Sequence, residues 1–119
     1  MERGYDMGEE ITESWMHKIR ELAPKIKEAE YEIALNDADC KRKYAKLKMK
    51  ALGEGCKTVS AQEVYADMDD GLYTQRLRLG KSKGKLSALK VELKSLEIGF
   101  EQWRTESVNM RQEYKRYGG

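Results

Sequence analysis

The side chains that most often carry out chemistry are sparse in this sequence. His17 is its single histidine, and it lies in an acidic stretch beside Trp15. A lone histidine in such surroundings is more often a surface or packing residue than a general base. Cys40 and Cys56 do not form a CxxC motif, so we expect two free thiols. We therefore predict no catalytic residue and no enzymatic activity.

Two short segments resemble ligand-binding loops only in part. Residues 80–85 read GKSKGK, without the spacing of glycine to Lys-Ser/Thr that a phosphate loop requires. Asp67, Asp69 and Asp70 resemble the opening of a calcium loop, but Arg78 stands where the closing glutamate is needed. We expect these carboxylates to be helix-end charges. The sequence predicts no metal, no cofactor and no small-molecule substrate.

The cations are concentrated in two blocks. Residues 41–57 and residues 76–94 each carry a net charge of +6, whereas residues 1–40 carry −6 and residues 58–75 carry −4. The overall net charge of +2 conceals this separation. The two blocks are the strongest functional signal in the chain.

The elements that must position these blocks are helices. Hydrophobic residues make up 39% and charged residues 37% of 119 residues, which is typical of exposed helices with a narrow apolar stripe. Apolar residues spaced three and four apart predict a first long helix over about 12–52. Pro24 either kinks this helix or separates residues 12–23 as a short helix, and Gly53 and Gly55 end it.

A second start signal follows the glycines. Ser60 and Glu63 fit a capping box, which predicts a short helix over 60–70. Residues 69–71 either break that helix or form a loose point in a continuous one. A heptad pattern then predicts a second long helix over 72–117.

The apolar positions of both long helices should meet in one seam. Its predicted members, which close the hairpin or an oligomer, are Ile26, Ile33, Leu47, Leu86, Leu89, Leu93, Leu96, Phe100, Trp103 and Met110. Asn36 also falls on this seam, where it either fixes the register or is tolerated.

The predicted fold is therefore all-α, a long antiparallel, coiled-coil-like helical hairpin with a short intervening helix, in a single domain over 1–119. So thin a hairpin buries little surface, which favours a homo-oligomer. Periodicity leaves open whether the seam closes within one chain or between chains.

In such a hairpin the two basic blocks should lie side by side. Gly80 and Gly84 would keep this zone open to a phosphate backbone, and Tyr44 and Tyr73 could stack on bases. The alternative is a solvated face, partly neutralised by residues 63–70, or a surface for a protein partner. The candidate nucleic-acid-binding residues are Lys41, Arg42, Lys43, Lys46, Lys48, Lys50, Arg76, Arg78, Lys81, Lys83 and Lys85.

The order of elements resembles the UvsY-type recombination mediators of bacteriophages. The resemblance rests on the basic run at 41–50 and on Asn109-Met110-Arg111 near the end of the second helix. It covers most of the chain as a pattern, without a diagnostic motif. It implies an oligomer of the host cytoplasm that binds single-stranded DNA and helps to load a recombinase.

Two other classes of function stay open. One is a protein-directed inhibitor or adaptor, such as a phage antagonist of a host nuclease complex, whose acidic half would mimic nucleic acid. The other is a structural coiled-coil component. Residues 1–6 do not resemble a signal peptide and no apolar run reaches the length of a membrane span, so we expect a cytoplasmic protein without a membrane partner.

Overall fold

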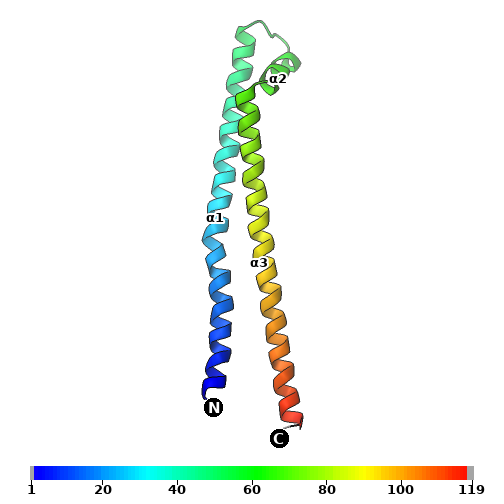
Figure 1. Ribbon diagram of the computed structural model, residues 1–119. Helices are drawn as coiled ribbons and strands as arrows, with labels where there is room; N and C mark the ends of the chain where they lie inside the picture. Colours follow the sequence, from blue (N-terminus) through cyan, green and yellow to red (C-terminus); the bar gives the residue numbers. More distant parts are fainter. Residues whose placement is uncertain (1, 118–119) are drawn as a thin grey trace. The chain divides into compact units, whose positions relative to one another are not determined.

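The protein is built from three helices. The computed structural model describes the backbone of residues 2–117 and the side chains of residues 8–116. Figure 1 shows α1 (Glu2–Gly53), the short α2 (Val59–Asp67) and α3 (Asp70–Tyr117) in chain order. Residues 2–117 contain no strand. The predicted all-α class and the helical hairpin with a short middle helix are confirmed.

The first helix is longer than predicted. It begins at Glu2, ten residues before the predicted start, because residues 2–11 show no apolar periodicity that would indicate a helix. It also continues through Pro24. Of the two alternatives at Pro24, a separate helix over residues 12–23 is therefore wrong. Proline lacks an N–H, so one hydrogen bond to the preceding turn is missing at this point. The neighbouring turns tolerate that loss without ending the helix.

The end of α1 follows the glycine signal. Gly55 has a φ of 99°, in the left-handed region that glycine adopts without strain. The amide of Cys56 donates to the carbonyl of Ala51 at 2.9 Å, and the amide of Gly55 donates to that of Leu52 at 3.2 Å. These two bonds form a Schellman motif, which satisfies the last carbonyl groups of the helix and reverses the chain.

The start of α2 corrects the predicted cap. Thr58, and not Ser60, is the N-cap, and its hydroxyl accepts a hydrogen bond from the amide of Ala61 at 3.1 Å. Gln62 Nε2 donates to the carbonyl of Cys56 at 3.0 Å and so closes the connection. Both threonine and serine can cap a helix, but the turn that ends α1 brings the chain into helical geometry two residues earlier.

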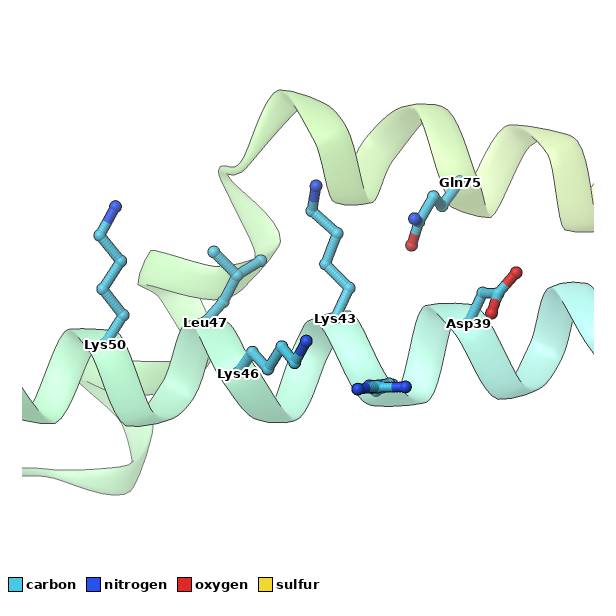
Figure 2. A pocket seen from close by; sticks show the side chains of 7 residues that line it. Asp39, Lys43, Lys46, Leu47, Lys50 and Gln75 are labelled. Atoms are coloured by element: carbon cyan, nitrogen blue, oxygen red, sulfur yellow. The ribbon is translucent and has the colours of Figure 1, made fainter.

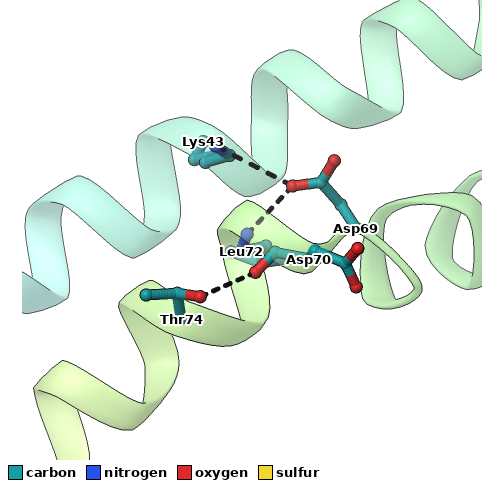
Figure 3. A network of polar contacts seen from close by, with 5 residues as sticks. All are labelled: Lys43, Asp69, Asp70, Leu72 and Thr74. Carbon is teal, nitrogen blue, oxygen red and sulfur yellow. Dashed lines mark hydrogen bonds and ion pairs between the residues drawn. The ribbon is translucent and has the colours of Figure 1, made fainter.

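The helix is interrupted between α2 and α3, which agrees with one of the two predicted alternatives. Asp69 is the residue before α3, and its Oδ2 accepts from the amide of Leu72 at 2.9 Å. Figure 3 shows this cap together with Thr74, whose hydroxyl donates to the carbonyl of Asp70 at 3.0 Å. A carboxylate at a helix N-terminus also interacts favourably with the helix dipole.

The helices form two compact units. One unit comprises residues 27–87 and the other residues 1–26 with 88–119. In the unit of residues 27–87, α2 and the first half of α3 pack against the second half of α1, and Ala29, Ala51, Ala66 and Leu72 are almost fully buried. The predicted seam residues Ile33, Leu47 and Leu86 are half-buried there.

The unit of residues 1–26 and 88–119 pairs the first half of α1 with the rest of α3. Leu22 is buried, and the predicted seam residues Ile26, Leu89, Leu93, Leu96, Phe100 and Trp103 are half-buried. Met110 differs from prediction, because its side chain is 70% exposed. Gly8 and Glu9 line the same shallow groove as Met110, and neither offers an apolar side chain to cover it.

Candidate nucleic-acid interface

The first basic block occupies the last turns of α1, within the unit of residues 27–87. Tyr44 links it to the second block: Lys48 Nζ lies 5.3 Å and the Arg76 guanidinium 5.5 Å from the centre of its ring. Cations over an aromatic face are attracted by the ring quadrupole. Tyr44 is therefore engaged with cations, whereas Tyr73 is exposed and open to a stacking partner.

The register between α1 and α3 corrects the predicted juxtaposition. Asn36 Nδ2 donates to Ser82 Oγ at 2.7 Å, and Glu32 lies 3.6 Å from Lys85 Nζ. The blocks are therefore offset. Lys41 to Lys50 lie beside the start of α3, and the stretch from Arg78 to Lys85 lies beside the acidic residues 32–39. Arg76 meets the first block at the ring of Tyr44.

The offset follows from the connection between the helices. Residues 54–69 include the whole of α2, and they bring the chain back several residues below the end of α1. Neither the charge pattern nor the apolar periodicity of the sequence reveals how far this connection carries the chain back along α1. As a result, Lys85 of the second block lies beside Glu32 and is partly neutralised within the chain.

A groove between α1 and α3 gathers the first block. It has a volume of about 380 Å³. Figure 2 shows Asp39 and Lys43 pointing from α1 toward α3, and Gln75 pointing from α3 toward α1. The lining residues are Asp39, Arg42, Lys43, Lys46, Leu47, Lys50 and Gln75. Four cations and one carboxylate give the groove a net charge of +3, which suits an anionic ligand.

Asp69 holds Lys43 at the rim of this groove. In Figure 3 the carboxylate that caps α3 also faces Lys43, with 3.8 Å between Asp69 Oδ2 and Lys43 Nζ. The Lys43 side chain passes over Gly71, where an added Cβ would contact Lys43 Nζ. The ammonium group is the mobile end of a long side chain, so a larger residue would displace it at little cost. One carboxylate thus both starts the helix and orients a cation.

The remaining cations divide into paired and unpaired groups. Lys41 lies 2.9 Å from Asp37, and the hydrogen bond and charge of that carboxylate raise the pKa of the lysine. Arg76 pairs with Asp67 at 2.8 Å. Within the part of the chain whose side chains are described, the candidate cations without an ion pair are Arg42, Lys46, Lys48, Lys50, Arg78, Lys81 and Lys83.

The two glycines of the second block are open to solvent. A Cβ added at Gly80 or Gly84 would meet nothing within 4 Å. Neither glycine is therefore required for packing within this chain. Their position leaves the backbone of α3 accessible beside Lys81, Lys83 and Lys85.

An aromatic cluster in the other unit joins the predicted seam residues Phe100 and Trp103 to Trp15, whose part in the seam was not predicted. The rings of Trp15 and Phe100 are 6.3 Å apart between centroids, and those of Phe100 and Trp103 are 6.1 Å apart. A Cβ added at Gly99 would lie 2.9 Å from Trp15 Cη2. Gly99 thus makes room for the indole. Nothing in the sequence indicated this contact apart from the presence of Gly99 inside a strong heptad pattern.

The single histidine and the two cysteines have ordinary surroundings. His17 Nε2 lies 2.9 Å from Glu21 on the exposed surface of α1, and Cys40 and Cys56 are free thiols. Between residues 8 and 116, no three histidine, cysteine, aspartate or glutamate side chains gather as a metal would require. None of the helices over residues 2–117 combines the length and the apolar character that crossing a membrane requires.

Comparison of the chain with protein-family models, with curated proteins and with solved structures gave no match.

Proposed function

We propose that this protein is a non-enzymatic DNA-associated accessory protein that binds single-stranded DNA, or a recombination or replication complex containing it, through the groove of α1 and α3. The observation that carries the proposal is the unpaired cationic row in that groove. Arg42, Lys46 and Lys50 follow one another at intervals of four residues, or about 6 Å along a helix. A row of cations along one axis fits a linear polyanion better than a single small anion.

The chemistry of the row favours contacts to phosphate over contacts to bases. Lysine and arginine neutralise backbone phosphates, and the release of counterions supplies most of the affinity. Phosphate contacts position the ligand without reading its sequence. The exposed ring of Tyr73, near the start of α3, offers a surface on which an unpaired base can stack. Binding should therefore depend little on sequence and prefer single strands.

A salt series with a fluorescent single-stranded oligonucleotide tests the proposal. Fluorescence anisotropy would be measured for the wild type, for the groove variant Arg42→Gln/Lys46→Gln/Lys50→Gln, and for the control variant Lys81→Gln/Lys83→Gln/Lys85→Gln. Both variants lose three positive charges from the same unit. We expect binding to weaken steeply with salt, and the slope of log K against log salt to fall by about 2 in the groove variant.

The control variant distinguishes binding at the groove from general electrostatic attraction to positive charge. It should retain most of the binding, because Lys85 is already paired and its neighbours lie beside an acidic stretch. Equal losses in both variants would contradict the groove as the binding site. No binding by the wild type at low salt would overturn the proposal and favour a protein partner, as expected for an inhibitor or adaptor.

A further inference from the structure

α1 carries a second row of side chains, apolar except for Arg42, on the side of the helix opposite its buried residues. Its members alternate four and three residues apart, and they are Tyr31, Leu35, Ala38, Arg42, Ala45, Met49 and Leu52. This spacing keeps all seven on one side of a helix, opposite the buried Ala29, Cys40 and Ala51. We call this set the outer row.

The outer row is uncovered. Tyr31 is 68% exposed, Leu35 49%, Met49 70% and Leu52 50%, and Ala38 and Ala45 are exposed as well. Single exposed apolar residues are common on proteins, but an aligned row of them marks an interaction surface. The 4–3 alternation is the pattern by which one helix packs along another.

Similar residue types occur at similar distances on both sides of Arg42 in the row. Two copies of α1 laid antiparallel would place Tyr31 opposite Leu52, Leu35 opposite Met49, and Ala38 opposite Ala45. A two-fold interface requires such a self-complementary surface. The alanines allow the helices to approach near the axis, where the Arg42 stem can lie along the partner and its guanidinium can reach solvent.

Charge selects the same orientation. Residues 28–39 contain five carboxylates and no cation, whereas residues 41–50 contain six cations and no carboxylate. Antiparallel pairing lays the acidic stretch of each copy along the basic stretch of the other. Parallel pairing would place like charges together, which is unfavourable. Apolar spacing and charge thus indicate one geometry.

We infer that the outer row is a self-association surface, which pairs antiparallel with the outer row of a second copy of this chain. Arg42 then has two competing partners, because it belongs to both the groove and the outer row. This competition rests on the proposed function: single-stranded DNA and the second copy both cover Arg42, so DNA should dissociate the dimer. The dimer itself does not depend on DNA binding.

Charge-swapped variants test the interface and its orientation together. Leu35→Lys and Met49→Glu both replace exposed side chains, so each variant should keep its helical circular dichroism. Each alone should be monomeric by sedimentation velocity, whereas the wild type sediments as a dimer. An equimolar mixture should recover the dimer, because L35K in one copy then faces M49E in the other. Leu77→Lys, an exposed substitution on α3, is the matched control and should stay dimeric.

The outcomes separate this inference from the proposed function. A wild type that sediments as a monomer at every concentration overturns the inference. A mixture that stays monomeric, when each variant alone is monomeric, overturns the antiparallel pairing, since a parallel dimer never brings positions 35 and 49 together. Both measurements use protein without DNA, so they stand even if the anisotropy assay finds no binding. If the oligonucleotide binds and the protein stays dimeric, the competition is contradicted, but the dimer interface is not.

Discussion

Single residues in this protein show why similar substitutions should have opposite effects. Gly80 and Gly99 both lie inside α3 and both weaken the helix by the same backbone entropy. The space around them differs. Gly80 faces solvent, whereas the indole of Trp15 occupies the space that a Cβ at Gly99 would need.

We expect Gly80→Ala to raise the free energy of unfolding by about 1 kcal/mol, since alanine restricts the unfolded chain and favours helix. Gly99→Ala gains the same propensity but must displace the Trp15 ring, at a cost of about 1–3 kcal/mol. It should therefore be neutral or destabilising. Urea unfolding of the two variants checks this, and equal stabilisation of both would show that Trp15 does not pack against Gly99.

The contact of Asn36 with Ser82 is a second residue-scale feature. Ser82 is only 8% exposed, and its hydroxyl accepts from Asn36 and donates to the carbonyl of Arg78 at 3.1 Å. Both hydrogen-bonding functions of the serine are thus satisfied inside an apolar seam. Such a pair specifies register, because any slip of the helices leaves a buried polar group unpaired.

A double-mutant cycle measures this contact. Asn36→Ala and Ser82→Ala should each destabilise the fold, and together they should cost less than the sum of the two. We expect a coupling of about 1 kcal/mol, typical of a neutral hydrogen bond. Chemical denaturation of the four proteins supplies the values. Additive effects would mean that the two side chains do not interact in solution.

At the scale of elements, the caps decide where helices begin. The Thr58 hydroxyl satisfies an amide of the first turn of α2, whereas Ser60 lies inside that turn. Thr58→Ala should therefore lower the free energy of unfolding by about 1 kcal/mol. Ser60→Ala should change it by only a few tenths of a kcal/mol, because alanine is a good helix former.

Thermal or urea unfolding of the two cap variants distinguishes the structure from the sequence-based prediction. A larger loss for Ser60→Ala would restore the capping box that the sequence suggested. The result also bears on the register, since α2 lies in the connection that returns the chain to α1. A frayed α2 would loosen the contact of Asp69 with Lys43.

At the scale of the whole molecule, burial is distributed unevenly. The unit of residues 27–87 contains almost all of the nearly inaccessible side chains. Between residues 104 and 116, only Ser107 is even half-buried. Helices are stabilised mainly by packing of an apolar face, so the last turns of α3 should open more readily than its first half.

Hydrogen exchange followed by mass spectrometry tests this gradient. Amides of residues 72–86 should exchange slowly, and amides of residues 104–116 should exchange faster by orders of magnitude, although both segments belong to α3. Uniform protection along α3 would contradict the gradient and would indicate that a partner covers Met110 and its neighbours.

The local parts of this fold were predictable because their causes are local. Apolar spacing marked both long helices, and the glycines after Leu52 marked the end of α1. The start of α1 was missed because residues 2–11 carry no apolar period. The cap of α2 was misplaced because Thr58 and Ser60 offer the same chemistry, and only the turn before them decides between the two.

The sequence by itself determined an all-α chain with a narrow seam and two strongly basic blocks, since periodicity and charge need no knowledge of distant contacts. Only the tertiary structure decided which charges meet. The return through α2 and the bond between Asn36 and Ser82 set a register in which the first block lines an open groove and the second lies along carboxylates. Register is a long-range property, because it depends on where two segments that are 46 residues apart in sequence come into contact.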